Sequence, residues 1–168
     1  LVDRIRDGRS FCTRRVTGIQ DGKAIFTMSA SFHSGDEGIE HQDTMPPVPE
    51  PEELVDAQTV EEMAATDLYR EWKEWDVRIV PADATRKTPG IAAQQRVWMR
   101  YRDKLPDDQV FHICTLAYLS DMTLLGASKV PHPGVVTQTA SLDHAMWFLR
   151  PFRADEWLLY DQTSPSAG

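Results

Sequence analysis

The stretch from residue 106 to residue 131 constrains the fold most, because it has the pattern of a helix that is apolar on nearly every side. "PDD" at 106–108 is a helix start signal, the apolar run continues to Leu125, and Gly126 and Pro131 supply the stop. The apolar positions are Val110, Phe111, Ile113, Cys114, Leu116, Leu119, Met122, Leu124 and Leu125. Such a helix is buried all round. The simplest way to bury it is an antiparallel sheet wrapped around it.

Four strands are predicted around this helix, two on either side of it in the sequence. "WDVRIVPAD" (75–83) and "QQRVWMRYRDKLP" (94–106) precede it, and "VVTQTASLDHAMWFLRPF" (135–152) and "EWLLYDQTSPSAG" (156–168) follow. Alternation in the second of these strands places its basic side chains on one face. The pattern predicts an α+β fold.

The N-terminal part predicts a β-hairpin, because two β-rich runs within residues 9–33 are separated by "QDG". A hairpin alone is not stable, so it must belong to a larger sheet. We therefore expect a tandem of two similar units. Residues 1–33 are the C-terminal hairpin of the first unit, and residues 76–168 are the second. Between them, residues 34–75 read as an acidic, Pro-rich linker followed by one or two short surface helices.

Charge and composition exclude several classes of partner. The formal net charge is −8, with carboxylates concentrated in residues 36–76, which disfavours a nucleic-acid partner. Cys12 and Cys114 lack CxxC spacing and fit buried free thiols in a reducing compartment. There is no apolar run of about twenty residues, so we expect a cytoplasmic protein without membrane insertion. Because the chain begins without Met and stops directly after a strand, we expect a fragment that is incomplete at both ends.

Asp121 is the most informative candidate for chemistry, because it falls near the end of the apolar helix. A carboxylate there should be largely buried, which is costly unless it is hydrogen-bonded, hydrated or paired. It could bond locally to a strand backbone or hydroxyl, or it could act as a base or water-orienting group in a cleft. The spacing leaves both readings open.

A catalytic serine triad is not expected, although Ser141, Asp143 and His144 are close in sequence. In a regular strand Ser141 and Asp143 share one face and His144 points to the other, and no GxSxG elbow surrounds the serine. The histidines do not have metal-ligand spacing either. They are His33, His41, His112, His132 and His144. Without a GxGxxG or P-loop pattern, we expect no metal and no cofactor.

Several blocks of the sequence together resemble the acyl-CoA thioesterase II family. They are "VDRIRDGRSF", "RRV", "Q-GK-IF-M-ASF", "LAYLSD-TLLG", "ASLDHAMWF-RPFRADEWLLYD" and "SPSAG". The resemblance covers nearly all of the chain except the linker. It implies a double hotdog fold, in which each of two tandem units is an antiparallel sheet wrapped around a long helix.

The resemblance also implies a catalytic set of Asp, Ser or Thr, and Gln that positions a water for direct attack on a thioester. The family's Asp falls on Asp121, and its hydroxyl residue falls on Ser141. The family's Gln lies on a later strand, after "SAG", and neither Gln138 nor Gln162 matches its context. Strict alternation would put Ser141 on the face away from the helix, so a bulge or a cleft would have to bring it near Asp121.

The function that this resemblance implies is hydrolysis of acyl-CoA to free fatty acid and CoA. The alternatives are a non-hydrolytic acyl-CoA-binding or regulatory hotdog module and a hotdog enoyl-CoA hydratase. Exposed sheet edges and Trp-rich strands favour a homo-oligomer.

Overall fold

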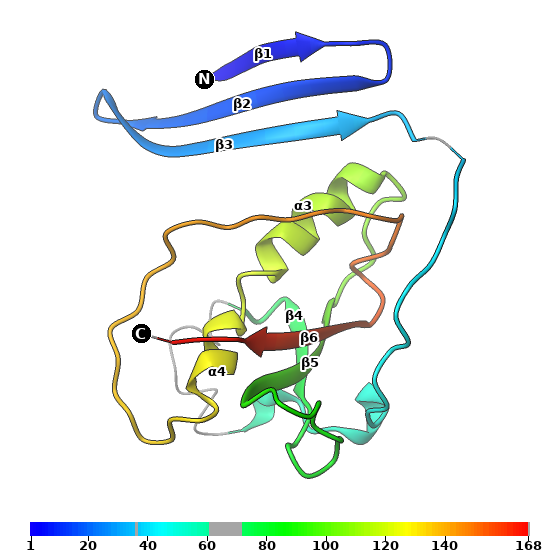
Figure 1. The fold of residues 1–168 in the computed structure, drawn as a ribbon, viewed down its shortest axis with the longest axis vertical. Coiled ribbons are helices and arrows are strands. Elements are labelled where there is room, and N and C mark those ends of the chain that lie inside the picture. The colour runs from blue at the N-terminus through cyan, green and yellow to red at the C-terminus, as the bar shows by residue number, and fades with distance from the viewer. Residues whose placement is uncertain (36, 61–71, 168) are drawn as a thin grey trace. The chain divides into compact units, whose positions relative to one another are not determined.

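The computed structural model describes residues 1–35, 37–60 and 72–167, and it divides into two compact units (Figure 1). Unit 1 comprises Leu1–Thr44, and unit 2 comprises Met45–Gly168. Each unit contains a three-stranded antiparallel sheet, and unit 2 also contains two described α-helices. The α+β class expected from the sequence is confirmed.

Unit 1 is a sheet of β1 (Val2–Asp7), β2 (Phe11–Gln20) and β3 (Lys23–His33) in that order. The predicted turn between β2 and β3 is confirmed, because Gln20 pairs with Lys23 across it. Asp21 and Gly22 have φ angles of 49° and 74°. Two successive left-handed residues are what a type I′ hairpin requires, which explains the Asp-Gly pair. The sheet has one strand more than the expected hairpin, since β1 pairs with β2.

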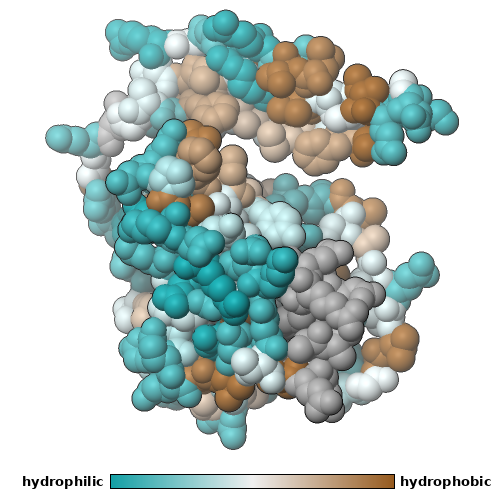
Figure 2. All heavy atoms as spheres, turned by 180° about the vertical axis from the view of Figure 1, so that it is seen from behind, coloured by the Kyte–Doolittle hydropathy of each residue, from teal (hydrophilic) through white to brown (hydrophobic). Residues whose placement is uncertain are grey.

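The sheet of unit 1 leaves large apolar side chains uncovered. None of its described residues is buried. The exposed large apolar residues of β1–β3 are Val2, Ile5, Phe11, Ile19, Ile25, Phe26, Met28 and Phe32. Figure 2 shows hydrophobic residues gathered over this sheet on one face of the molecule. Most of the stability of this unit must therefore come from its ladder hydrogen bonds and cross-strand pairs.

Unit 2 is organised around β4 (Trp75–Ile79), β5 (Ala93–Tyr101) and β6 (Leu158–Ser164), with β5 in the middle. These strands confirm three of the four strands predicted for this part of the chain. Val77, Val97 and Met99 point to one face and are fully buried. They pack with Leu119 and Met122 in the core.

The opposite face of this sheet carries charged side chains, as the alternation in β5 predicts. Asp76 on β4 pairs with Arg100 on β5, and Arg100 Nε and Arg102 Nε donate to its two carboxylate oxygens at 2.7 and 2.8 Å. The Arg100 guanidinium also lies 4.3 Å from the ring centroid of Trp157. These contacts make the charged face an ordered network.

The segment expected to be a linker is in part packed against the sheet. Residues from Met45 onward belong to unit 2, where η1 (Pro51–Glu53) and η2 (Ala57–Thr59) are short 3₁₀ turns. Pro51 and Ala57 are buried, and the indole of Trp98 donates to the carbonyl oxygen of Pro49 at 2.9 Å. The remainder of the helices expected between Pro51 and Trp75 falls largely on residues 61–71, which lie outside the described residues.

The expectation of one continuous, fully buried helix is wrong in two respects. The chain forms α3 (Gln109–Leu119), a turn, and then α4 (Leu124–Lys129), so Gly126 lies inside a helix. In α3 only His112 and Leu119 are buried. Four apolar or aromatic side chains of these helices are 44–61% exposed: Val110, Phe111, Tyr118 and Leu125. The physical reason is that the described sheet covers only one side of α3.

The predicted strand at 135–152 is also wrong, because residues 135–149 have no regular secondary structure. The segment runs past α3 as an unpaired trace (Figure 1, orange). A strand forms only where a neighbouring edge accepts its backbone hydrogen bonds, and this segment pairs with no described strand. Side-chain contacts attach it to the end of α3 instead. This segment is therefore free of the face alternation that a strand would impose.

Two observations concern the expectations of buried free thiols and of no membrane insertion. Cys12 and Cys114 are both free, as expected, but the predicted burial is wrong, because Cys12 is only partly buried and Cys114 is exposed. The stretch Gln109–Lys129 is apolar enough to cross a membrane by length and composition alone. Core helices of soluble proteins can have the same length and composition.

Candidate active site

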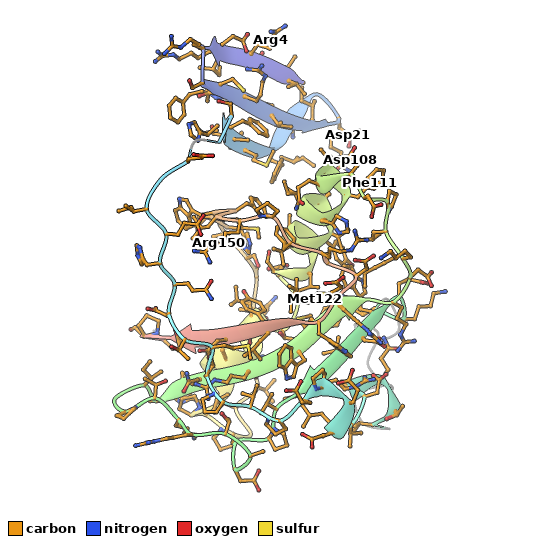
Figure 3. The ribbon with its side chains drawn as sticks, turned by 90° about the vertical axis from the view of Figure 1, so that its right-hand side faces the viewer. Arg4, Asp21, Asp108, Phe111, Met122 and Arg150 are labelled. Atoms are coloured by element: carbon orange, nitrogen blue, oxygen red, sulfur yellow. The ribbon has the colours of Figure 1, made fainter. Side chains whose placement is uncertain are left out.

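Asp121 lies in the turn that joins α3 to α4. The Asp108 carboxylate accepts from the backbone N–H of Val110 at 3.0 Å, which caps α3 and sets its start. Figure 3 labels Asp108 at this end of α3 and Met122 near the other end. The buried Met122 side chain anchors the turn in the core. Its neighbour Asp121 is left at the surface, so the expectation that this carboxylate is largely buried is wrong.

Asp121 and Ser141, the two residues predicted to act together, lie within hydrogen-bond distance. Ser141 Oγ donates to Asp121 Oδ1 at 3.3 Å, and both side chains are exposed. The strand geometry that would have turned Ser141 away does not apply, because residues 135–149 do not form a strand. Neither a bulge nor a second cleft is needed to bring them together.

The three residues of the excluded triad have different partners. While Ser141 contacts Asp121, His144 Nε2 lies 2.9 Å from Ser120 Oγ. Asp143 lines a pocket at the end of α3. Among the described contacts, Ser141 and His144 are therefore not paired with each other, although they are close in the sequence.

Ser120 forms a second link between the end of α3 and the unpaired segment. Its hydroxyl donates to the carbonyl oxygen of Ala117 at 2.8 Å and contacts His144 Nε2 and Met146 Sδ, the latter at 3.2 Å. Ser120 is buried. Sequence reasoning did not single out Ser120, although its position directly before Asp121 was a usable signal. The two links hold the segment around residues 141–146 against the end of α3.

A mainly apolar pocket of about 510 Å³ lies beside these links. Its walls come from the C-terminal end of α3, the start of α4, residues 143–147 and β6. They are Leu116, Leu119, Ser120, Leu124, Asp143, His144, Ala145, Met146, Trp147, Leu158, Leu159 and Tyr160. A volume of this order is typical of small-molecule sites.

Tyr160 connects β6 to the site and was not anticipated from the sequence. Its hydroxyl donates to the backbone carbonyl of Ser120 at 3.0 Å. Burial raises the pKa of Tyr160, and the negative charge of Asp121 raises that pKa further. The phenol therefore remains protonated and acts as a hydrogen-bond donor to the last turn of α3.

Neither Gln138 nor Gln162 takes part in these contacts. Gln162 is buried on β6, and its side-chain amide donates to Thr123 Oγ1 at 2.7 Å, while Gln138 lies in the exposed unpaired segment. Among residues 1–35, 37–60 and 72–167, no group of three His, Cys, Asp or Glu side chains is arranged to hold a metal ion.

The site combines a carboxylate and a hydroxyl beside an apolar pocket, and it lies on an antiparallel α+β framework. The family model described as "Acyl-CoA thioesterase" matches residues 68–168. The model described as "Acyl-CoA thioesterase N-terminal domain" matches residues 1–33. The chain belongs to the acyl-CoA thioesterase family.

Two relatives cover almost the whole chain. The acyl-coenzyme A thioesterase 8 of Mus musculus is 36% identical over 184 residues, which span 99% of this chain and 58% of the relative. The crystal structure of the acyl-CoA thioesterase II TesB2 from Mycobacterium marinum superposes with a TM-score of 0.89 at 56% identity, covering 100% of this chain and 61% of that one. This chain thus spans about three fifths of the length of these relatives.

A third similarity concerns the fold. A conserved protein from Alicyclobacillus acidocaldarius, described as having a hot dog fold, has a TM-score of 0.57 and 25% identity over 79% of this chain and 46% of that one. Together with the antiparallel sheets of both units, this similarity agrees with an α+β hotdog class.

Proposed function

We propose that the protein hydrolyses acyl-CoA thioesters to a free fatty acid and CoA. The observation that carries the proposal is the hydrogen bond from Ser141 to Asp121. Asp121 directly follows Ser120, and Ser120 lines the apolar pocket. A water beside this pair can hydrogen-bond to the carboxylate and to the hydroxyl at the same time. The apolar lining of the pocket suits an acyl chain. The proposal takes its substrate class from the family.

The proposed reaction is direct attack by water without a covalent enzyme intermediate. Asp121 accepts a proton from the water as its oxygen attacks the thioester carbonyl carbon, and Ser141 orients that water by a hydrogen bond. The tetrahedral intermediate then collapses, the carbon–sulfur bond breaks, and CoA leaves as a thiolate that takes up a proton. The exposure of Asp121 supports this role, because its carboxylate is open to exchange with bulk water.

The proposal includes a double hotdog architecture and an assembled, cytoplasmic protein. The family match to an N-terminal domain at 1–33 and a second match from residue 68 support two tandem units. The uncovered apolar side chains of unit 1 support association with a further surface, for which we propose a second copy of the protein. The two free cysteines support a reducing compartment.

The test is release of free thiol from a series of acyl-CoAs, read with a thiol reagent such as DTNB. Asp121→Asn keeps the shape of the side chain and removes the base, so we expect kcat to fall by about a hundredfold or more. Ser141→Ala removes one hydrogen bond to the water and should lower kcat by about tenfold. Cys114 is exposed and reacts with the reagent, so a trace without substrate must be subtracted.

Asp83→Asn and Ser29→Ala are matched controls, because both residues are exposed and no described contact links them to the site. Normal turnover by Asp121→Asn would remove the acid from the mechanism, and normal turnover by Ser141→Ala would remove the hydroxyl. Binding of acyl-CoA without thiol release would favour the non-hydrolytic module. Water addition to an enoyl-CoA without thiol release would favour the hydratase.

A further inference from the structure

A second, smaller pocket in unit 2 has one lysine and several hydroxyl-bearing residues in its lining. It measures about 160 Å³ and lies between the end of α4 and the start of the unpaired segment. Its lining residues are Ser128, Lys129, His132, Val135, Thr137, Thr139 and Ala167. Five of these seven residues carry a hydroxyl, an ammonium or an imidazole group. That volume is below the roughly 300 Å³ of a site for a whole small molecule, so it suits a single chemical group.

Among the residues that the structure describes, no carboxylate forms an ion pair with the lysine of this pocket. Most arginines of unit 2 are committed to ion pairs, for example Arg96 with Asp161 and Arg153 with Asp155. Lys129 forms no ion pair with any residue that the structure describes. The backbone carbonyl of Lys129 accepts from the N–H of His132 at 2.8 Å, so the turn satisfies this acceptor at the end of α4. In a chain with a net charge of −8, such a place is suited to an anion.

Along the unpaired segment, the residues that line the small pocket precede Ser141, and the residues that line the apolar pocket follow it. Thr137 and Thr139 line the small pocket, Ser141 contacts Asp121, and residues 143–147 line the apolar pocket. On the opposite wall, α4 begins with Leu124 at the apolar pocket and ends with Lys129 at the small one. Five residues of helix span about 8 Å.

From this arrangement we propose that the small pocket binds a phosphate group of the coenzyme A part of the substrate. Lys129 supplies a charged hydrogen-bond donor, and the hydroxyls of Thr137 and Thr139 donate to the remaining phosphate oxygens. The Ser128 hydroxyl donates to the carbonyl oxygen of Leu125 at 2.9 Å and only lines the pocket. An acyl thioester bound in this way has its phosphate end at the cationic pocket, its thioester at Asp121 and Ser141, and its acyl chain in the apolar pocket. The inference rests on the proposed function for the identity of the ligand.

The experiment compares the wild-type protein with Lys129→Gln and with the control Lys87→Gln. Lys87 is exposed in another loop, and its substitution changes the net charge equally. Equilibrium binding of CoA and of adenosine 3′,5′-bisphosphate is measured by calorimetry. Hydrolysis is measured with acyl-CoA, with the acyl thioester of 4′-phosphopantetheine, and with that of pantetheine, which has no phosphate.

We expect Lys129→Gln to weaken CoA binding and to raise KM for acyl-CoA by about tenfold, the effect of losing one charge-assisted hydrogen bond. Turnover of the pantetheine thioester should stay at the wild-type rate, and Lys87→Gln should bind CoA as the wild type does. Two further measurements show which phosphate is bound. If Lys129→Gln lowers hydrolysis of the phosphopantetheine thioester, the pocket binds the pantetheine phosphate. If it weakens binding of adenosine 3′,5′-bisphosphate, the pocket binds a phosphate at the adenosine end.

Two results would overturn the inference. One is equal CoA binding by Lys129→Gln and Lys87→Gln, and the other is an equal loss of activity on the pantetheine thioester, which points to a structural effect. If the wild-type protein hydrolyses none of the three thioesters but Lys129→Gln still weakens CoA binding, the phosphate pocket stands and the proposed hydrolysis fails.

Discussion

Two arginine side chains hold the charged residue Asp76 in the sheet of unit 2. Burial alone would raise the pKa of Asp76, but hydrogen bonds from Arg100 and Arg102 outweigh that effect and hold its pKa below 3.8, the ordinary value for Asp. A carboxylate whose pKa is lowered on folding stabilises the fold above its unfolded pKa. That stabilisation is lost as the pH falls through the lowered pKa.

Replacing Asp76 with Asn should lower the free energy of unfolding by about 2 kcal/mol at neutral pH, since two charged hydrogen bonds weaken at once. The difference from the wild type should shrink as the pH falls below 3.8. Urea denaturation over a series of pH values measures both effects. The exposed Asp103 provides the control Asp103→Asn. A difference that grows in acid would contradict the assignment.

At the scale of elements, the turn between α3 and α4 is the feature on which the site depends. Thr123 has a φ of 62°, which is unfavourable for a β-branched residue. Its hydroxyl accepts the side-chain N–H of Gln162 at 2.7 Å, and Gln162 is buried on β6. The bond between a strand and a strained turn fixes the end of α3 from which Asp121 projects.

Thr123→Val tests this bond without changing the backbone requirement, because Val has the same size and the same branch at Cβ. The buried amide N–H of Gln162 then has no hydroxyl to donate to, and we expect the free energy of unfolding to fall by about 1–3 kcal/mol. Thr27→Val, at an exposed strand position, is the control. Chemical denaturation of both variants is the measurement. Unchanged stability of Thr123→Val would show that the turn is held in some other way.

For the whole molecule, the two units differ in how much of their surface is buried. The described part of unit 1 has no buried residue, whereas Val77, Val97 and Met99 of unit 2 are fully buried. Backbone amides that are protected only by ladder hydrogen bonds open more easily than amides in a packed core.

Hydrogen exchange on this 168-residue chain should therefore show faster exchange in β1–β3 than in β5. Mass spectrometry of peptides from the two regions, at several protein concentrations, measures the difference. Equal protection at low concentration would mean that the apolar sheet of unit 1 is covered within a single chain. Protection that rises with concentration would support the proposed association of copies.

The sequence predicted the turns, strand faces and helix starts that depend on neighbouring residues in the chain. The Asp-Gly pair specifies the turn at Asp21, alternation specifies the two faces of β5, and Asp108 specifies the start of α3. The pairing of Asp121 with Ser141 was predicted from the family resemblance, and the contact between their side chains agrees with it.

Tertiary structure decided the features that depend on distant partners. Residues 135–149 have the composition of a strand but no paired edge, and α3 has an apolar surface but a sheet on only one side. The exposure of Asp121, the link from Ser120 to His144 and the two pockets follow from that packing. The reason is physical: turn and helix signals act over a few residues, whereas burial and strand pairing require a neighbour that the local sequence does not contain.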